Sequence, residues 1–380
     1  MKNKFNILLY VIIALAYWAL SHFNFEYYAT GIASDYSIYV IIILFLISSL
    51  FIYNSQVSVK KKWLYKLIIF FTILTFVTQI TDILSGTINA AIRNLLHILA
   101  IPIGFLLGQT FPQMIICQSG KSNDFLVLLL IFPIFYIAYR YLSLDWIDPD
   151  SLFFVILLFP LVFCLKKDLY QILLFILVGI IIAISAKRSI LIAYVINLLL
   201  FICKYSFLNK GKSSKKIAVF IGMIVLICWF IANDSETINN IIFRFQLIEE
   251  DSGSGRTELY NIVLGSFSNS SFISQMFGHG YRSVISLLDG IPAHNDFLEI
   301  LYDFGLVPLV VYCLILLKFV QLCFNRLRHR LFNNATLILC ASTFNLIVLG
   351  SLNNIFVDTF FIFTSFLCLG ISLKMVEQNH

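Results

Sequence analysis

Apolar runs of 16–20 residues recur along the whole chain. A run of that length spans the hydrocarbon core of a bilayer as an α-helix. In hydrocarbon only helices and closed barrels satisfy their backbone hydrogen bonds, and barrel strands would alternate apolar with polar residues, which these runs do not. The composition agrees, because 60% of the residues are hydrophobic, 12% are charged and the mean hydropathy is +0.93. We therefore expect an all-α polytopic membrane protein and exclude a soluble globular fold.

The runs predict about twelve membrane spans. They cover residues 5–23, 38–53, 64–83, 94–113, 125–142, 151–165, 169–185, 189–203, 217–232, 304–323, 334–350 and 354–373. The first run resembles a signal peptide, but its length and the lack of a small-residue cleavage site favour an uncleaved span. The eight cysteines lie in or beside the runs without a CxxC pair, so we interpret them as core residues.

Basic residues collect in alternate loops. If both termini are cytoplasmic, about 19 of the 26 Lys and Arg residues lie inside and 7 lie outside. The positive-inside rule therefore predicts an even number of spans with both termini in the cytoplasm. The inside clusters are Lys2/Lys4, Lys60–Lys62, Lys166–Lys167, Lys204–Lys216 and Arg326–Arg330.

One outer loop, at residues 233–303, is far longer than an ordinary connector. It divides the chain into residues 1–232 with spans one to nine, the loop itself, and residues 304–380 with the last three spans. We expect the loop to form a small ordered cap that carries the functional site. Within it, RTELYNIVLGSF predicts a helix after Gly255. The apolar positions expected on one face are Leu259, Ile262, Val263 and Phe267.

The first polar motif of the loop is Ser254-Gly255-Arg256. A glycine lets the backbone approach a ligand closely, and a guanidinium can hold a phosphate through two hydrogen bonds. The alternative is a hinge with a solvated arginine.

The second motif joins GHGYR, from Gly278 to Arg282, with PAHNDFLEILYDFG, from Pro292 to Gly305. The latter predicts a helix that enters the membrane, with His294 near its positive N-terminal end. The residues expected on its polar face are Asn295, Asp296, Glu299, Tyr302 and Asp303. The alternative is a solvated polar face with a capping Asn.

The third motif is the outer turn Ser185–Ser189, which carries Lys187 and Arg188. Two cations there run against the positive-inside bias, which suggests a partner or a substrate, with snorkelling to lipid phosphate as the alternative. Arg93 and His97 form a weaker pair at the outer start of the fourth span.

Other site chemistries find less support. His279, His294 and Glu299 lack the HxxxH or HExxH spacing of a helical metal site. No GxSxG-like elbow supports a Ser/His/Asp triad.

Together, SGR, GHG and AHNDFLEILYDFG resemble the superfamily of O-antigen polymerases (Wzy-type) and O-antigen ligases (WaaL-type). The long loop before the tenth span and the arginine at Ser185–Ser189 are also similar. The resemblance implies a GT-C-like glycosyltransferase fold in the bacterial inner membrane, acting at the periplasmic face without metal or cofactor. It implies a donor glycan on undecaprenyl pyrophosphate. Expected partners are that lipid-linked oligosaccharide and membrane lipid, with a chain-length regulator as a candidate protein partner and no nucleic acid.

This chemistry needs fixed cations, because negative charge develops on the leaving pyrophosphate. The candidates are Arg188, Arg256 and Arg282, with Lys187 and Arg244 in second rank. We expect His294 to accept the proton of the incoming sugar hydroxyl. The candidates to orient it or bind sugar are Asn295, Glu299 and Asp303.

The motifs do not separate polymerase from ligase. The short chain, rich in Phe, Ile and Leu, is more similar to the polymerases. A lipid-linked oligosaccharide flippase is a further alternative, although transporters usually show two related halves. A purely structural membrane scaffold is the last alternative, and the clustered Arg and His residues disfavour it.

Overall fold

The computed structural model describes residues 33–55, 62–80, 84, 88–117, 128–144, 149–165, 167–185, 187–208 and 255–378. Within these ranges the chain is helical and has no β-strand. The N-terminal helices are α3 (Ala33–Ser55), α4 (Lys62–Thr78), α6 (Ile88–Cys117), α7 (Leu128–Leu144), α8 (Pro149–Leu158), the 3-10 helix η2 (Phe159–Cys164), α9 (Asp168–Ser185) and α10 (Arg188–Leu208). The C-terminal helices are α13 (Arg256–Ser268), α14 (Phe272–Phe277), α15 (Ser283–Leu287), α16 (Asp296–Asp303), α17 (Leu306–Arg328), α18 (Asn334–Leu352) and α19 (Thr359–Gln378).

The described helices confirm an all-α membrane architecture. Among the described residues, five segments are long and apolar enough to cross a bilayer: Ala91–Phe111, Asp168–Ser185, Leu306–Arg328, Asn334–Leu352 and Thr359–Gln378. Described helices overlap ten of the predicted span ranges, and the other two, 5–23 and 217–232, lie outside the described residues. The twelve-span count and the GT-C-like fold therefore stay predictions.

Helices α6 and α19 pack most closely, because glycines face each other across their interface. A Cβ atom on Gly108 or on Gly370 would lie 2.2 Å from a carbonyl oxygen of the opposite helix. Gln109 Nε2 also donates to the Gly370 carbonyl oxygen at 2.9 Å. Small residues that let backbones approach are the usual means of helix association in membranes, where burial of apolar surface adds little.

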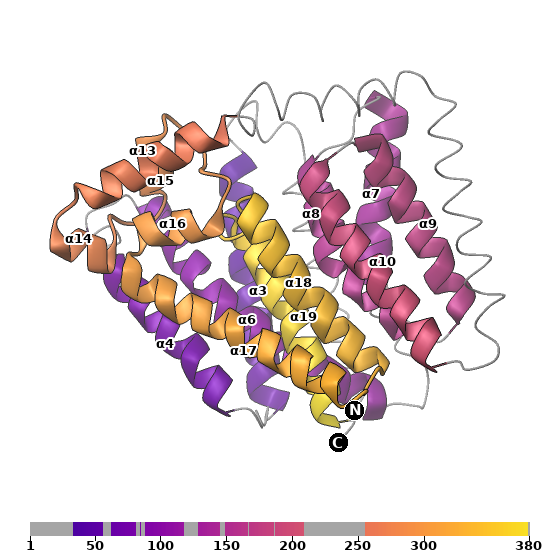
Figure 1. Cartoon of the computed structure of the whole chain (residues 1–380). Helices are drawn as coiled ribbons and strands as arrows, with labels where there is room; N and C mark the ends of the chain where they lie inside the picture. Colours follow the sequence, from indigo (N-terminus) through magenta and orange to yellow (C-terminus); the bar gives the residue numbers. More distant parts are fainter. Residues whose placement is uncertain are drawn as a thin grey trace.

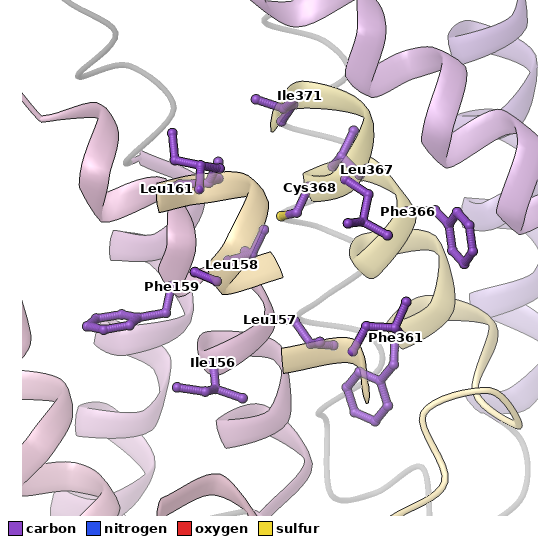
Figure 2. Close-up of a cluster of buried hydrophobic side chains, with 14 of the residues drawn as sticks. Ile156, Leu157, Leu158, Phe159, Leu161, Phe361, Phe366, Leu367, Cys368 and Ile371 are labelled. Atoms are coloured by element: carbon purple, nitrogen blue, oxygen red, sulfur yellow. The ribbon is translucent and has the colours of Figure 1, made fainter. Parts of the chain in front are cut away.

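Helices α18 and α8 also pack against α19, and η2 packs mainly against α18. Figure 2 shows apolar side chains of this part of the core: Ile156, Leu157 and Leu158 from α8, Phe159 and Leu161 from η2, and Phe361, Phe366, Leu367, Cys368 and Ile371 from α19. All of them are buried. Helix α19 is therefore enclosed by protein on most sides, which makes it the centre of the bundle.

Two asparagines link the surrounding helices within the apolar interior. Asn197 Nδ2 of α10 donates to Asn345 Oδ1 of α18 at 2.7 Å, and Asn345 Nδ2 donates to the Ile156 carbonyl oxygen of α8 at 2.7 Å. Amide hydrogen bonds of this kind join helices where water cannot compete. They therefore link α8, α10 and α18 to one another inside the bundle.

Candidate functional site

Helices α13 to α16 form a cap at one end of the bundle, next to the start of α17 (Figure 1). The cap has a small core of its own, made of Val263, Val284, Leu288, Ala293 and Tyr302. The helix predicted after Gly255 is confirmed as α13, and Leu259 and Phe267 pack against this core as expected. The placement of Ile262 is wrong, because α13 buries only a narrow stripe and Ile262 is 43% exposed.

Helix α16 begins directly after the His294-Asn295 pair. The Asn295 side chain caps it, since Oδ1 accepts hydrogen bonds from the backbone N–H groups of Phe297 (3.0 Å) and Leu298 (3.2 Å). Its Nδ2 donates to the Ser351 carbonyl oxygen at 3.1 Å, at the end of α18. Asn295 therefore fixes the start of α16 against a membrane helix as well as capping it.

The polar face of α16 is its buried face. Asp296 and Glu299 are 0% exposed and Asp303 is 1% exposed. Burial raises the pKa of both Asp296 and Asp303 well above the ordinary value. Asp296 Oδ1 accepts from the Phe356 N–H at 2.8 Å, which ties α16 to the segment between α18 and α19. The solvated-face alternative is wrong, because α16 lies between the rest of the cap and that segment, and both offer backbone N–H groups to its carboxyl groups.

Asp303 organises the loop that carries Arg282. Its Oδ2 accepts from the Arg282 N–H at 2.7 Å and its Oδ1 from the Val284 N–H at 2.8 Å. Arg282 sits in the left-handed region at φ 64° and its side chain is exposed. Two backbone N–H groups that donate to one carboxyl group hold this backbone in place. Asp303 thus positions Arg282 at the surface.

Two glycines bring this loop against the start of α17. Gly278 (φ 81°) and Gly305 (φ 91°) both lie in the left-handed region. A Cβ on Gly278 would lie 2.2 Å from the Asp303 carbonyl oxygen, and one on Gly305 would lie 2.4 Å from the Met276 carbonyl oxygen. The GHG motif and the final Gly of the helix motif are therefore parts of one backbone contact.

We expect Gly278→Ala to destabilise the cap by about 3 kcal/mol or more, because the Cβ meets backbone atoms and the left-handed conformation disfavours alanine. Gly265→Ala is the matched control. Gly265 lies inside α13 with nothing within 4 Å of an added Cβ, so alanine should be neutral or stabilise by about 0.5–1 kcal/mol. Amide hydrogen exchange of residues 255–305 in detergent measures both effects. Equal protection in the two variants would contradict the close contact at Gly278.

Glu299, like Asp296, has one buried carboxylate oxygen without a hydrogen-bond partner among the described residues. Its Oε1 accepts from the Ala293 N–H at 2.6 Å, directly before His294, while its Oε2 is buried with no hydrogen-bond partner among the described residues. Burial raises the pKa of Glu299 to about 7, even though the Ala293 N–H and the nearby Arg282 guanidinium both lower it. Glu299 and Arg282 therefore interact electrostatically beside the backbone that presents His294.

We expect cap stability to fall as the pH rises from about 4.5 to about 7. The folded-state pKa of Glu299, about 7, lies above its ordinary value of 4.5, so the folded cap binds more protons in this window. The contribution of Glu299 to the free energy of unfolding is fully present below pH 4.5 and lost above pH 7. It amounts to about 3 kcal/mol. Asp296 and Asp303 act in the same direction. Glu299→Gln should reduce this pH dependence in thermal unfolding at pH 5 and pH 8, and an unchanged slope would contradict the assignment.

The two histidines of the cap have different surroundings. His279 is held on both ring nitrogens, with Nε2 2.9 Å from Ser270 Oγ and Nδ1 3.1 Å from the Tyr302 carbonyl oxygen. Its ring also stacks on Tyr302 at 4.2 Å. His294 is half-buried at φ 55°, between the Glu299-bound Ala293 and the Asn295 cap. His279 is therefore a packing residue, while His294 is held through its backbone on both sides.

A third histidine, from α6, reaches the same loop. The His97 ring lies 4.4 Å from that of Tyr281, and its Nδ1 lies 3.3 Å from Thr359 Oγ1. Tyr281 donates to the Val357 carbonyl oxygen at 2.8 Å. Asp358 and Arg282 both lie within electrostatic range of His97. From the sequence we paired His97 only with Arg93. His97 and Tyr281 are far apart in the chain, so no sequence spacing predicts their contact.

No contact described above joins the remaining predicted residues to this cluster. Arg188 is the first residue of α10, and Arg256 is the first residue of α13. Lys187 Nζ lies 5.5 Å from the ring centre of Phe153, whose ring meets Phe361 at the start of α19. The contacts described above bring Arg282, Glu299 and Asp303 together around α16. They do not join Arg188 or Arg256 to that group, and Arg244 lies outside the described residues.

Comparison with known proteins identifies the region that holds these residues. Residues 173–313 match a family model described as O-antigen ligase. The match runs from α9 into α17 and includes Lys187, Arg188, Arg256, Arg282 and His294. No curated protein matches the chain. The match confirms the resemblance that the motifs predicted: across this segment the chain is similar to the O-antigen ligase family, and so to the O-antigen polymerase and ligase superfamily.

Proposed function

We propose that the protein is an O-antigen (surface-polysaccharide) polymerase. It transfers a glycan from undecaprenyl pyrophosphate onto another lipid-linked repeat unit, without a metal ion and with inversion at the anomeric carbon. The observation that supports this most is the placement of His294, in an ordered cap directly before a candidate membrane span and inside the family match. Members of the matched family are glycosyltransferase-like enzymes.

The proposal places the cap at the periplasmic face of the bacterial inner membrane. It includes twelve spans with a GT-C-like fold and both termini in the cytoplasm. The charge distribution supports this orientation. Trp63, at the start of α4, contacts Lys318 in the C-terminal half of α17, with 4.7 Å from Lys318 Nζ to the ring centre. Arg326 and Arg328 lie in the last turn of α17, at the end of this helix away from the cap (Figure 1), as the positive-inside rule requires of a cytoplasmic face.

In the proposed reaction the oxygen of an acceptor hydroxyl attacks the anomeric carbon of the donor. The bond between that carbon and the pyrophosphate oxygen breaks, and its electron pair leaves with undecaprenyl pyrophosphate. The hydroxyl proton passes to the imidazole of His294, a group that can accept it near neutral pH. Arg188, Arg256 and Arg282 balance the charge of the leaving pyrophosphate, with Lys187 and Arg244 in support.

In the proposed site Asp303 and Glu299 position other residues, whereas from the sequence we expected them to orient His294 or bind sugar. Asp303 is committed to two backbone N–H groups, and Glu299 is buried beside the backbone of His294. In the proposed site they hold Arg282 and His294 in position, and Asn295 fixes the helix start. Exposed groups such as the Arg282 guanidinium remain to meet the substrate.

Ligation to lipid A core is the alternative function, and the description of the matched family model favours it. Deletion of the gene separates the possibilities. A lipid A core that carries single repeat units indicates polymerase, and a bare core with lipid-linked polymer retained indicates ligase. Loss of lipid-linked units from the periplasmic face indicates a flippase and would overturn both.

A further inference from the structure

The helix α14 lies at the edge of the cap, beside the start of α17 (Figure 1). Ser271 caps it, because the Ser271 Oγ accepts from the Ser274 N–H at 3.2 Å. Its far end is fixed by the close backbone contact between Gly305 and Met276. The orientation of α14 is therefore determined at both ends.

This helix turns its polar side inward. Gln275 Nε2 donates to three carbonyl oxygens around the end of α13: those of Phe267 at 3.2 Å, Ser268 at 3.1 Å and Ser270 at 3.2 Å. Its apolar side faces outward, with Phe272 73% exposed and Ile273 72% exposed. In water the stable orientation is the reverse, with the aromatic rings against the cap core.

The outward side continues the apolar face of a candidate membrane span. Phe277, at the end of α14, is 43% exposed, and α14 packs on α17. Along α17 the exposed side chains lie at helical spacing on one face: Leu306, Val310, Leu314 and Leu317. The surrounding sequence is also uncharged, because no Asp, Glu, Lys or Arg lies between Glu258 and Arg282.

We propose that α14 is an interfacial helix whose apolar side is embedded in the acyl chains of the adjacent membrane leaflet. The exposed residues that meet lipid are Phe272, Ile273 and Phe277. A helix of this kind lies in the plane of the interface with its apolar face about 5–10 Å into the boundary between headgroups and acyl chains. The large aromatic side chains gain most from this transfer. The inference holds whichever sugar chemistry the cap performs.

This anchor sets the depth of the cap. Gly278 and Gly305 link α14 rigidly to the Arg282 loop and to the start of α17. Arg282 is therefore held close to the membrane surface, at the level of lipid phosphates. If the proposed function is correct, that is the level at which a lipid-linked pyrophosphate lies.

Photo-cross-linking of the full-length protein tests the anchor. The photoreactive amino acid p-benzoyl-phenylalanine replaces Phe272, whose high exposure leaves room for it, in nanodiscs of phosphatidylethanolamine and phosphatidylglycerol. After irradiation, mass spectrometry identifies the adduct. Leu317, 58% exposed on α17, is the position expected to react with lipid in any case. Asn269, exposed at the end of α13, is the polar control only a few residues away.

We expect phospholipid adducts at Phe272 comparable to those at Leu317, and at least about tenfold fewer at Asn269. This contrast reflects the depth of apolar insertion. Phospholipid yields at Phe272 as low as at Asn269 would overturn the proposal. A cross-linked dimer would instead show that a second copy of the chain covers this surface. An adduct with another polypeptide would show that a protein partner covers it, and a polyprenyl adduct in native membranes would show that the substrate binds there. Each of these results rejects the lipid anchor and leaves the proposed function standing.

Discussion

Replacement of His294 by alanine is expected to abolish visible polymer, since loss of a general base costs about 10²–10⁴ in rate. His294→Gln separates the two roles that the side chain can play. Glutamine keeps a hydrogen-bonding group of similar reach but cannot take the proton, so it should fail as completely as alanine if His294 is the base. Partial activity would mean that His294 only orients a sugar. Polymer length on gels and rates with purified lipid-linked donor measure both.

The structure decides which histidine is a fair control. His279→Ala would remove two ring hydrogen bonds and the stacking on Tyr302, so it should destabilise the cap and imitate lost chemistry. His329 is exposed at the end of α17 opposite the cap, so His329→Ala should leave activity unchanged. All variants must reach equal membrane levels. Long chains from His294→Ala at a normal level would move the base to another residue, with Asp296, Glu299 and His279 as the next to test.

Loss of Arg188 or of Arg256 is expected to reduce the rate about 10²–10³-fold, the size usual for removing one fixed group that stabilises developing negative charge. Lysine at either position keeps the charge but loses the planar fork that binds two phosphate oxygens, so activity should still fall sharply. Because both arginines are proposed to hold the same pyrophosphate, the double variant should lose less than the product of the two single effects.

Arg328→Lys is the matched control for these arginine variants, because Arg328 is exposed at the end of α17 away from the cap. Donor turnover with purified lipid-linked substrate measures the loss, and thermal unfolding checks that each variant is folded. Near-normal polymer from Arg188→Ala would remove this residue from the site. Strictly multiplicative losses in the double variant would mean that Arg188 and Arg256 act on separate groups.

Much of the architecture follows from the sequence alone, because a bilayer permits few solutions. A long apolar run must become a helix, and α17, α18 and α19 lie where the runs predicted them. The cap was also predictable in outline, since a long outer loop with turn glycines and a helical pattern needs an ordered fold of its own. Helix capping was predictable from the sequence as well, because Asn295 caps α16, as one of the two interpretations of this motif proposed.

The side on which a polar residue lies could not be read from the chain. The polar face of α16 has the same periodicity whether it meets water or buried backbone N–H groups, and only packing against the α18–α19 segment decides for burial. The same holds for α14, where the hydrogen bonds of Gln275 to α13 turn Phe272 outward. Contacts such as His97 with Tyr281 join distant segments. Such a contact depends on how both segments pack in three dimensions, so neither segment alone carries a pattern that predicts it.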